Sequence, residues 1–206
     1  MMHGPRRRST PTSNAMTEKL AHLHGPPQPS NWVKRFLPGI ARGGHVLDVA
    51  CGAGRHIWLA LENGYRVTGI DRDLSAAGEL MGRPEAELIE ADLEDGGPFP
   101  FKGRIFDGVI VANYLWRPIL ADIIACVADD GVLIYETFAL GHERHGRPSR
   151  PEFLLKPNEL IEAVLPHLAV IAYEHGVIEG RRPKIVQRIA ACGKAHEWAG
   201  RGPVSL

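Results

Sequence analysis

The chain has 206 residues, enough for one domain with a substantial buried core. Lys plus Arg and Asp plus Glu each number 24, so the formal net charge is zero and gives no overall attraction to nucleic acid or anionic membrane. No apolar run approaches the roughly 18 residues that a membrane-spanning helix needs, and no apolar segment follows the N-terminal arginines as it would in a secretory signal. We therefore expect a cytoplasmic protein that binds neither nucleic acid nor membrane, with its oligomeric state left open.

The three cysteines, Cys51, Cys126 and Cys192, lie far apart and form no CxxC pair. An odd, scattered set is typical of reduced cytosolic thiols rather than of a disulfide framework or a zinc site. We interpret Cys51, which borders a glycine-rich turn, as a small buried residue rather than a nucleophile.

The composition divides the chain into three parts. Residues 1–29 are polar and rich in proline, which predicts a flexible N-terminal arm. The domain is predicted to follow over residues 30–192, with a C-terminal tail over residues 193–206. Ser30 or Asn31 is placed to cap the first helix, which should end near Pro38.

Short apolar runs then alternate with helical patterns along the domain. The predicted strands span residues 45–50, 66–71, 86–91, 105–112 and 131–138. The predicted helices between them span residues 55–64, 73–82 and 117–129. Strands separated by helices of this length are typical of βαβ units, which form a parallel sheet with helices on both faces.

The last third of the domain has a different pattern. A further helix is predicted over residues 155–165, followed by strands over 167–175 and 184–192. The connection between these two strands is too short for a crossover helix, so we expect an antiparallel hairpin. The sequence thus predicts an α/β fold with a parallel sheet and a C-terminal hairpin.

A glycine-rich turn ends the first predicted strand, within "VLDVACGAGRH" (46–56). In open α/β sheets ligands bind beyond the carboxyl ends of the strands, where glycines let the backbone come close to them. Gly52 and Gly54 supply two glycines of the G-x-G-x-x-G dinucleotide fingerprint, but Ile57 occupies the third position, which disfavours NAD. A P-loop is excluded because no Gly-Lys-Ser/Thr follows.

The same stretch resembles the first motif of the class I S-adenosylmethionine-dependent methyltransferases: two hydrophobic residues, Asp, three further residues and Gly-x-Gly. Its "CGAGRH" form is similar to the small bacterial branch that includes the tellurite-resistance methyltransferases. The resemblance covers the segment from Ser30 to Cys192. It implies S-adenosylmethionine as the cofactor and a single-domain, Rossmann-like three-layer sandwich. In that fold a seven-stranded, mostly parallel sheet has an antiparallel strand in its C-terminal hairpin.

The resemblance also implies roles for three aspartates. Asp71 ends the second predicted strand, and its carboxylate suits the two ribose hydroxyls, with a helix cap as the alternative. Asp92 and the backbone N–H of Leu93 match the family's adenine-binding positions, with a turn-forming aspartate as the alternative. Asp48 lies inside a buried strand, where a carboxylate needs hydrogen bonds, and would brace the glycine loop or accept from the cofactor's amino group.

Further positions around these motifs complete the predicted cofactor site. Asn113 should lie at the tip of the fourth strand, near the methionine part of the cofactor. Arg72 would lie along the adenine edge or simply on the surface. The full predicted set is Asp48, Cys51, Gly52, Gly54, Arg55, His56, Asp71, Arg72, Asp92, Leu93 and Asn113.

The acceptor side is predicted to lie in the segment after the fifth strand, "YETFALGHERHGRPSRPEFLLKP" (135–157). Loops of this length are often lids. The candidate catalytic residues are His142, His145, Glu136 and Tyr114. A metal site is not predicted, because "HERH" differs in spacing from the zinc-binding H-E-x-x-H pattern.

For the arginines and aromatic residues near the predicted acceptor side, the sequence leaves two interpretations open. Arg144, Arg147 and Arg150 either hold an anionic acceptor or form a solvated surface. Tyr114 is a candidate for lining the site. Trp116 either lines the site or anchors the next helix.

These patterns favour methyl transfer from S-adenosylmethionine to a small-molecule acceptor, because no added domain for recognising nucleic acid or protein is evident. A non-catalytic S-adenosylmethionine- or nucleotide-binding module is the alternative. An NAD(P)-dependent oxidoreductase is opposed by Ile57.

Overall fold

A computed structural model of the protein describes residues 28–200. Of the predicted N-terminal arm, residues 1–27 lie outside this range, as do residues 201–206 of the predicted tail. Within it, no helix is both long and apolar enough to cross a membrane.

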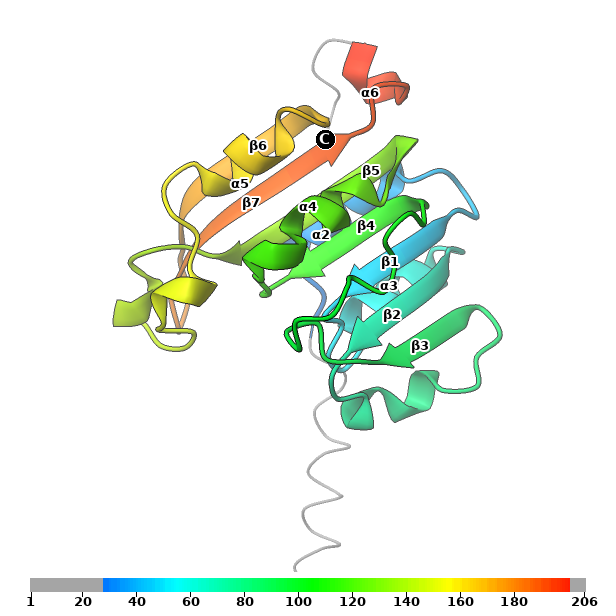
Figure 1. Cartoon of the computed structure of the whole chain (residues 1–206), viewed down its shortest axis with the longest axis horizontal. Coiled ribbons are helices and arrows are strands. Elements are labelled where there is room, and N and C mark those ends of the chain that lie inside the picture. The colour runs from blue at the N-terminus through cyan, green and yellow to red at the C-terminus, as the bar shows by residue number, and fades with distance from the viewer. Residues whose placement is uncertain (1–27, 201–206) are drawn as a thin grey trace, which may run out of the picture.

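Seven strands form one sheet in the order β3-β2-β1-β4-β5-β7-β6 (Figure 1). Neighbouring strands among β1 to β5 pair in parallel, whereas β7 is antiparallel to both β5 and β6. The predicted Rossmann-like α/β fold with its C-terminal hairpin is therefore confirmed. The strands are β1 (His45–Val49), β2 (Arg66–Asp71), β3 (Ala86–Glu90), β4 (Phe106–Ala112), β5 (Val127–Phe138), β6 (Ala169–Ile178) and β7 (Lys184–Cys192).

Helices cover both faces of the sheet. Figure 1 shows α4 and α5 on the face turned toward the viewer, with α2 and α3 behind. Successive residues of β1 point to opposite faces, so Val46 packs in one hydrophobic cluster and Leu47 in the other. The helices are α2 (Asn31–Phe36), α3 (Arg55–Glu62), α4 (Arg117–Ala125), α5 (Glu159–Val164) and α6 (Glu197–Gly200).

The helix α2 begins as the sequence predicts. The Ser30 hydroxyl accepts a hydrogen bond from the Trp32 N–H (3.0 Å), which satisfies one of the free donors of the first turn. Trp32 and Phe36 are buried behind the sheet, and the Trp32 indole N–H donates to the Ile189 carbonyl of β7 (3.1 Å). This helix therefore closes one face of the domain.

One predicted helix is wrong. Residues 73–82 contain only a 3₁₀ segment, Ser75–Leu80. The Asp73 carboxylate accepts from the Ser75 N–H (2.9 Å) and favours a turn, and Gly78 weakens the helix in its middle. The other 3₁₀ segments are Leu37–Gly39, His142–Arg144 and Pro151–Phe153.

The close packing of α3 on the sheet depends on a glycine in β2. A Cβ atom at Gly69 would lie 2.5 Å from Ile57 Cδ1 and 3.0 Å from Leu88 Cδ2. The side chain of Ile57 is fully buried. The glycine that lets helix and strand approach thus lies in the strand, which explains how Ile57 is accommodated in the helix.

We expect Gly69→Ala to destabilise the protein by about 1–2 kcal/mol, because the added methyl overpacks this contact. Urea unfolding of the variant measures this loss. Gly78→Ala is the matched control: a Cβ there meets nothing within 4 Å, so its stability should stay within about 0.5 kcal/mol of wild type or rise. Equal stability of the Gly69→Ala and wild-type proteins would contradict the packing argument.

Candidate active site

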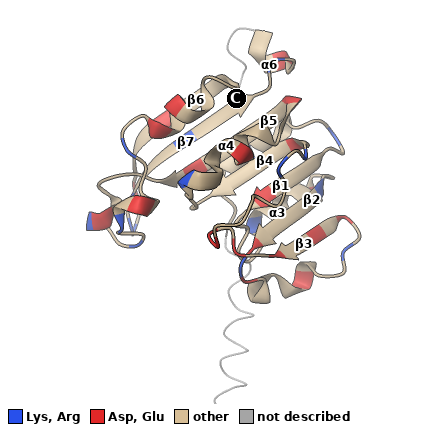
Figure 2. Ribbon diagram, in the orientation of Figure 1, with Lys and Arg blue, Asp and Glu red and all other residues tan. Residues whose placement is uncertain are grey.

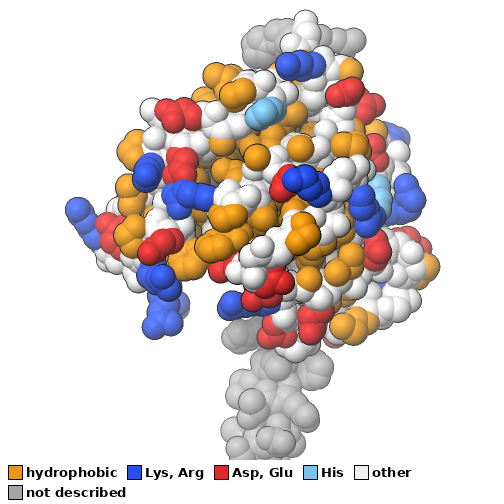
Figure 3. All heavy atoms as spheres, viewed as in Figure 1, with side chains coloured by type: hydrophobic (Ala, Val, Ile, Leu, Met, Phe, Trp, Pro, Cys, Tyr) orange, Lys and Arg blue, Asp and Glu red, His pale blue; other side chains and the backbone are white. Residues whose placement is uncertain are grey.

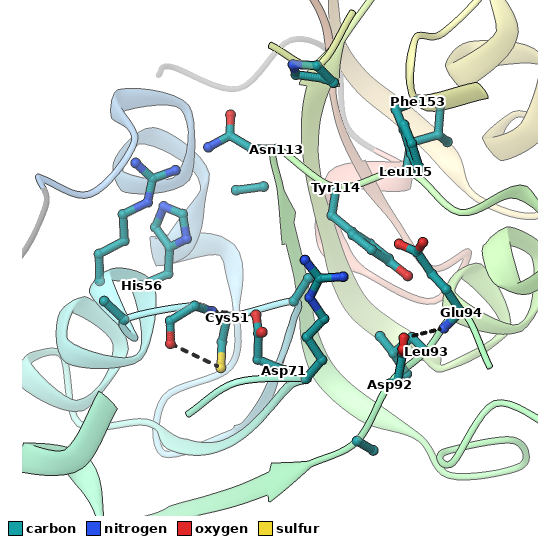
Figure 4. Close-up of a pocket in the computed structure, with 18 residues that line it drawn as sticks. Cys51, His56, Asp71, Asp92, Leu93, Glu94, Asn113, Tyr114, Leu115 and Phe153 are labelled. Atoms are coloured by element: carbon teal, nitrogen blue, oxygen red, sulfur yellow. Dashed lines mark hydrogen bonds between the residues drawn. The ribbon is translucent and has the colours of Figure 1, made fainter. Parts of the chain in front are cut away.

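A cavity of about 590 Å³ opens beyond the carboxyl ends of β1 to β4, a volume typical of small-molecule sites. Figure 4 shows its lining, which comes from strand ends and from loops that follow them. The lining residues are Ala50, Cys51, Gly52, Ala53, Arg55, His56, Asp71, Arg72, Ala91, Asp92, Leu93, Glu94, Ala112, Asn113, Tyr114, Leu115, Pro148 and Phe153.

The glycine-rich turn presents its backbone to this cavity. Gly52 and Gly54 have left-handed backbones, with φ of 55° and 74°. A Cβ at Gly52 would meet nothing within 4 Å, so the turn leaves open space where a ligand can approach the main chain. Gly54 does not line the cavity, because it faces Leu80, whose Cδ1 would lie 2.2 Å from an added Cβ.

Asp71 links the glycine turn to the end of β2. One carboxylate oxygen accepts from the Gly52 N–H (2.8 Å) and the other from the Asp73 N–H (3.1 Å). Each oxygen still has a free lone pair, because a carboxylate has about four acceptor sites. The side chain therefore holds the turn in place while it faces the cavity.

Asp48 lies in β1, two residues before the cavity begins at Ala50. Its carboxyl is almost fully buried, and Oδ2 has no hydrogen-bond partner among the described residues. Burial raises the pKa of this carboxyl to about 8, against the opposing effect of the Arg55 guanidinium, and the Asp71 carboxylate raises it further. Asp48 is therefore an unsatisfied acceptor beneath the cavity, although it does not line it.

His56 forms another polar group in the lining. Its Nε2 accepts from the Ser30 N–H (3.2 Å), which ties the start of α3 to the residue before α2. Burial, aided by Arg55, lowers the pKa of the imidazole to about 3, so the ring is neutral near pH 7. Arg55 donates to the Gln28 carbonyl (3.4 Å). Both side chains thus bring the N-terminal end of the described chain to the cavity.

The loop after β3 supplies an acidic part of the lining. Figure 2 shows acidic residues gathered near the carboxyl ends of β2 and β3. The Asp92 carboxylate accepts from the Glu94 N–H (2.9 Å). This turn leaves Leu93 buried between two carboxylates that line the cavity.

Tyr114 crosses the cavity from the end of β4, and Figure 4 shows its hydroxyl directed toward Asp92 and Glu94. The hydroxyl oxygen is buried without a hydrogen-bond partner among the described residues. Burial and the carboxylates of Glu94 and Asp92 raise the pKa of the phenol, so it stays protonated near pH 7. The Tyr135 hydroxyl donates to the Tyr114 carbonyl (3.0 Å) and holds this backbone in place.

The structure brings most of the predicted cofactor residues together. Nine of them line the cavity: Cys51, Gly52, Arg55, His56, Asp71, Arg72, Asp92, Leu93 and Asn113. Cys51 is buried, and burial raises the pKa of its thiol, so the thiol is protonated and unsuited to nucleophilic attack near pH 7. The roles assigned to these residues remain predictions.

The predicted catalytic candidates are not brought together. Tyr114 lines the cavity, whereas Glu136, His142 and His145 do not. The His142 ring stacks on Phe138 (centroids 4.2 Å apart), and its Nε2 lies 3.2 Å from the Arg147 carbonyl oxygen. Trp116 packs against the core instead of lining the cavity.

Several lining residues were not predicted from the sequence. Glu94 is absent from the predicted set, yet it lines the cavity. Leu115, Pro148 and Phe153 form an apolar part of the wall. An aromatic residue inside a proline-rich loop, as in "RPSRPEF", is the signal that points to Phe153.

The structure offers no metal centre in residues 28–200, where no group of three or more His, Cys, Asp or Glu side chains is arranged to hold an ion. The polar groups of the cavity suit an organic ligand with hydroxyl and amino groups. Asp71 offers free acceptor sites, Asp48 an unsatisfied acceptor and the glycine turn open main chain. These features fit S-adenosylmethionine, which carries a ribose and an amino group.

Comparisons with known proteins agree with this fit. Residues 46–131 match the family model described as a methyltransferase domain. TehB from Haemophilus influenzae is 19% identical, with a TM-score of 0.61, over 80% of this chain and 62% of TehB, which is less than two thirds of its length. A TehB-like S-adenosylmethionine-dependent methyltransferase from Corynebacterium glutamicum is 20% identical (TM-score 0.57; 88% of this chain, 96% of that one).

A third solved structure is the 1,6-didemethyltoxoflavin-N1-methyltransferase of Burkholderia thailandensis, with 1,6-didemethyltoxoflavin and S-adenosylhomocysteine bound. It is 18% identical, with a TM-score of 0.57, over 78% of this chain and 75% of its own. No curated protein sequence matches the chain.

The matched segment contains the glycine turn, Asp71, Asp92 and Asn113, which are the positions that meet at the cavity. The fold is shared with S-adenosylmethionine-dependent methyltransferases, and the segment that matches the methyltransferase-domain model is the one that builds most of the cavity.

The buried Asp48 gives a testable pH dependence of stability. Between pH 6.5 and 8 the folded protein keeps the Asp48 proton, whereas the unfolded carboxyl, with a pKa of about 3.9, has lost it. The free energy of unfolding should therefore fall by about 1–2 kcal/mol as pH rises through this window. The lowered pKa of His56 acts in the opposite direction and fades as the unfolded imidazole loses its proton between about pH 6.5 and 7.5, so it reduces the fall only in the lower part of this window.

Urea unfolding at pH 6.5, 7.25 and 8 measures this slope without added cofactor. Asp48→Asn should lose the slope, because the amide does not titrate. Asp95→Asn, at an exposed aspartate, should keep it. A wild-type slope in Asp48→Asn would show that another group carries the pH dependence.

Proposed function

We propose that the chain transfers the methyl group of S-adenosylmethionine to a small-molecule acceptor. The observation that carries this proposal is the continuity of the cavity. Its lining joins the strand-end residues of the cofactor motifs to Pro148 and Phe153 from the loop after β5. A module that only bound the cofactor would have no need of this second wall. The Burkholderia thailandensis protein, which has 1,6-didemethyltoxoflavin bound, supports the same substrate class.

We infer that the cofactor is held by the residues its motifs predict. Asp71 would accept from the ribose hydroxyls while keeping the Gly52 N–H. Asp92 and the Leu93 N–H would contact the adenine, and Asn113 would lie near the methionine part. Asp48 would accept, directly or through water, from the amino group, which would satisfy its unpartnered oxygen. The fully buried Ile57 in place of a third glycine supports this cofactor over NAD.

The residues around the acceptor act mainly by alignment. When bound, the cofactor supplies an activated methyl group on a sulfonium sulfur. The fixed walls of the cavity would hold a nucleophile in line with that sulfur, a contribution that reaches about 7–11 kcal/mol in favourable cases. Tyr114 stays protonated and His56 already accepts a hydrogen bond, so neither is prepared as a base near pH 7. The acceptor would therefore bring its own reactive electron pair.

A cytoplasmic location is also proposed. The three cysteines are free thiols, all buried, which is typical of proteins from a reducing compartment.

We expect Asp71→Ala to weaken S-adenosylhomocysteine binding at least about tenfold, because the variant loses charge-assisted hydrogen bonds to the ribose. Isothermal titration calorimetry with S-adenosylmethionine, S-adenosylhomocysteine and NAD measures the affinities. Asp73→Ala is the matched control, since Asp73 is exposed and does not line the cavity.

Unchanged affinity in Asp71→Ala would remove this residue from the cofactor site. Binding of NAD without binding of either S-adenosyl compound would overturn the proposed function itself.

A further inference from the structure

The cavity has two chemically different ends. Asp71 and Asp92 belong to the polar end, whereas Leu115, Pro148 and Phe153 make the other end apolar. Figure 4 shows the Leu115 and Phe153 side chains close together, with the Tyr114 ring between them and Asp71. The polar end suits the cofactor, so the apolar end is left for the acceptor.

The charged residues of the cavity lining do not favour an anion at the apolar end. Figure 4 shows the Glu94 carboxylate beside the Tyr114 ring. The two arginines of the lining, Arg55 and Arg72, come from the start of α3 and the end of β2, which carry the cofactor motifs. An anionic acceptor at the apolar end would therefore lose its hydration without gaining a cationic partner from the lining residues.

The three arginines of the loop after β5 do not supply a cationic partner from the cavity lining. Arg144, Arg147 and Arg150 are exposed and do not line the cavity. The Arg150 guanidinium lies over the Phe153 ring (5.6 Å to the centroid), but its Nε is 3.5 Å from a Glu152 carboxylate oxygen, which already balances its charge. Figure 3 shows basic side chains at this end of the molecule projecting into solvent. Of the two alternatives for these arginines, the structure favours a solvated surface.

The apolar wall is held by hydrogen bonds on both sides of Phe153. The Arg117 guanidinium donates to the carbonyl of Glu152 (2.6 Å) and to that of Leu154 (2.9 Å). It is also paired with the Glu159 carboxylate (2.5 and 2.8 Å), and the pKa of Arg117 is raised by this pairing. Arg117 therefore fixes the backbone that carries the Phe153 ring.

Two further anchors hold the same loop. The His142 ring bonds to the Arg147 carbonyl, next to Pro148. The fully buried Gln187 of β7 donates to the Lys156 carbonyl (2.6 Å) and accepts from the Leu160 N–H (3.1 Å). A wall anchored in this way is already ordered without a bound acceptor. Because no loop has to be ordered on binding, the entropic cost of binding is lower.

We propose that the acceptor is an uncharged, flat organic molecule that stacks against the wall of Tyr114, Leu115, Pro148 and Phe153, and that oxyanions do not bind there. This inference rests on the proposed methyl transfer and gives its substrate class. Aromatic and apolar walls stabilise a flat ligand by burying its faces. The resemblance to the tellurite-resistance branch does not extend to its acceptor.

The test uses the full chain saturated with S-adenosylhomocysteine, titrated by calorimetry with 2-naphthol as the flat uncharged probe or with sodium selenite as the oxyanion. We expect 2-naphthol to bind the complex and selenite to give no saturable heat. Phe153→Ala should weaken 2-naphthol binding at least about tenfold, because the ring is the largest apolar group of this wall. Phe153→Leu should weaken it less, and both variants should bind S-adenosylhomocysteine as the wild type does.

Arg147→Ala is the control, since its side chain is exposed, and it should leave 2-naphthol affinity unchanged. The proposal is overturned if 2-naphthol does not bind, if it binds equally well to wild type and to both Phe153 variants, or if selenite binds and Arg147→Ala abolishes that binding. Loss of fold in Phe153→Ala, seen as a lowered Tm, leaves Phe153→Leu to decide. Failure of the first step, binding of S-adenosylhomocysteine to the wild type, would instead overturn the proposed function.

Discussion

The cavity depends on how the chain leaves β1 and β4, which are neighbours in the centre of the sheet. The residues that follow them, Ala50 and Asn113, have left-handed backbones with φ of 55° and 58°. Such backbones cost non-glycine residues about 1–2 kcal/mol each. Hydrogen bonds from the Cys51 and Asn113 N–H groups to β2 and β5 help to offset this (3.0 and 2.9 Å). Because α3 then lies behind the sheet and α4 in front, the two chain segments diverge and leave a ligand site between them (Figure 1).

The local pattern of apolar and polar residues was enough to predict the strands and the positions where the chain leaves them. The strands follow short apolar runs bounded by Gly, Asn or Asp, and Asp71 and Asn113 lie at strand ends because each comes where an apolar run stops. The failure over residues 73–82 is also local. Apolar spacing favoured a helix there, but Asp73 bonds to the Ser75 N–H and Gly78 lowers helix propensity. The periodicity of apolar residues indicates which residues face the core, but it does not indicate side-chain hydrogen bonds that favour a turn over a helix.

The apolar wall that includes Pro148 and Phe153 was not predictable in the same way, because its position depends on contacts between distant parts of the sequence. Arg117 reaches carbonyls 35 and 37 residues further along the chain, and Gln187 reaches Lys156 from another strand. Nothing in the neighbourhood of Arg117 indicates which carbonyls it will meet. The sequence predicted the acceptor side in the loop after β5, and Pro148 and Phe153 of this loop line the cavity, but the histidine-rich pattern pointed to His142 and His145 instead of Phe153.

The two buried ionisable groups near the glycine turn explain how a polar site is tolerated next to a core. Asp48 keeps its proton up to about pH 8 and His56 stays neutral above about pH 3, so near pH 7 both are mainly uncharged. Burying neutral groups costs far less than burying ions. A bound ammonium group beside Asp48 would reverse this, because an adjacent cation lowers the pKa of a carboxyl. Ligand binding would then release the Asp48 proton, and the ion pair formed would replace an unsatisfied acceptor. Asp48 is thus tolerated in the empty fold as a neutral acid and would pair with a cationic ligand as a carboxylate.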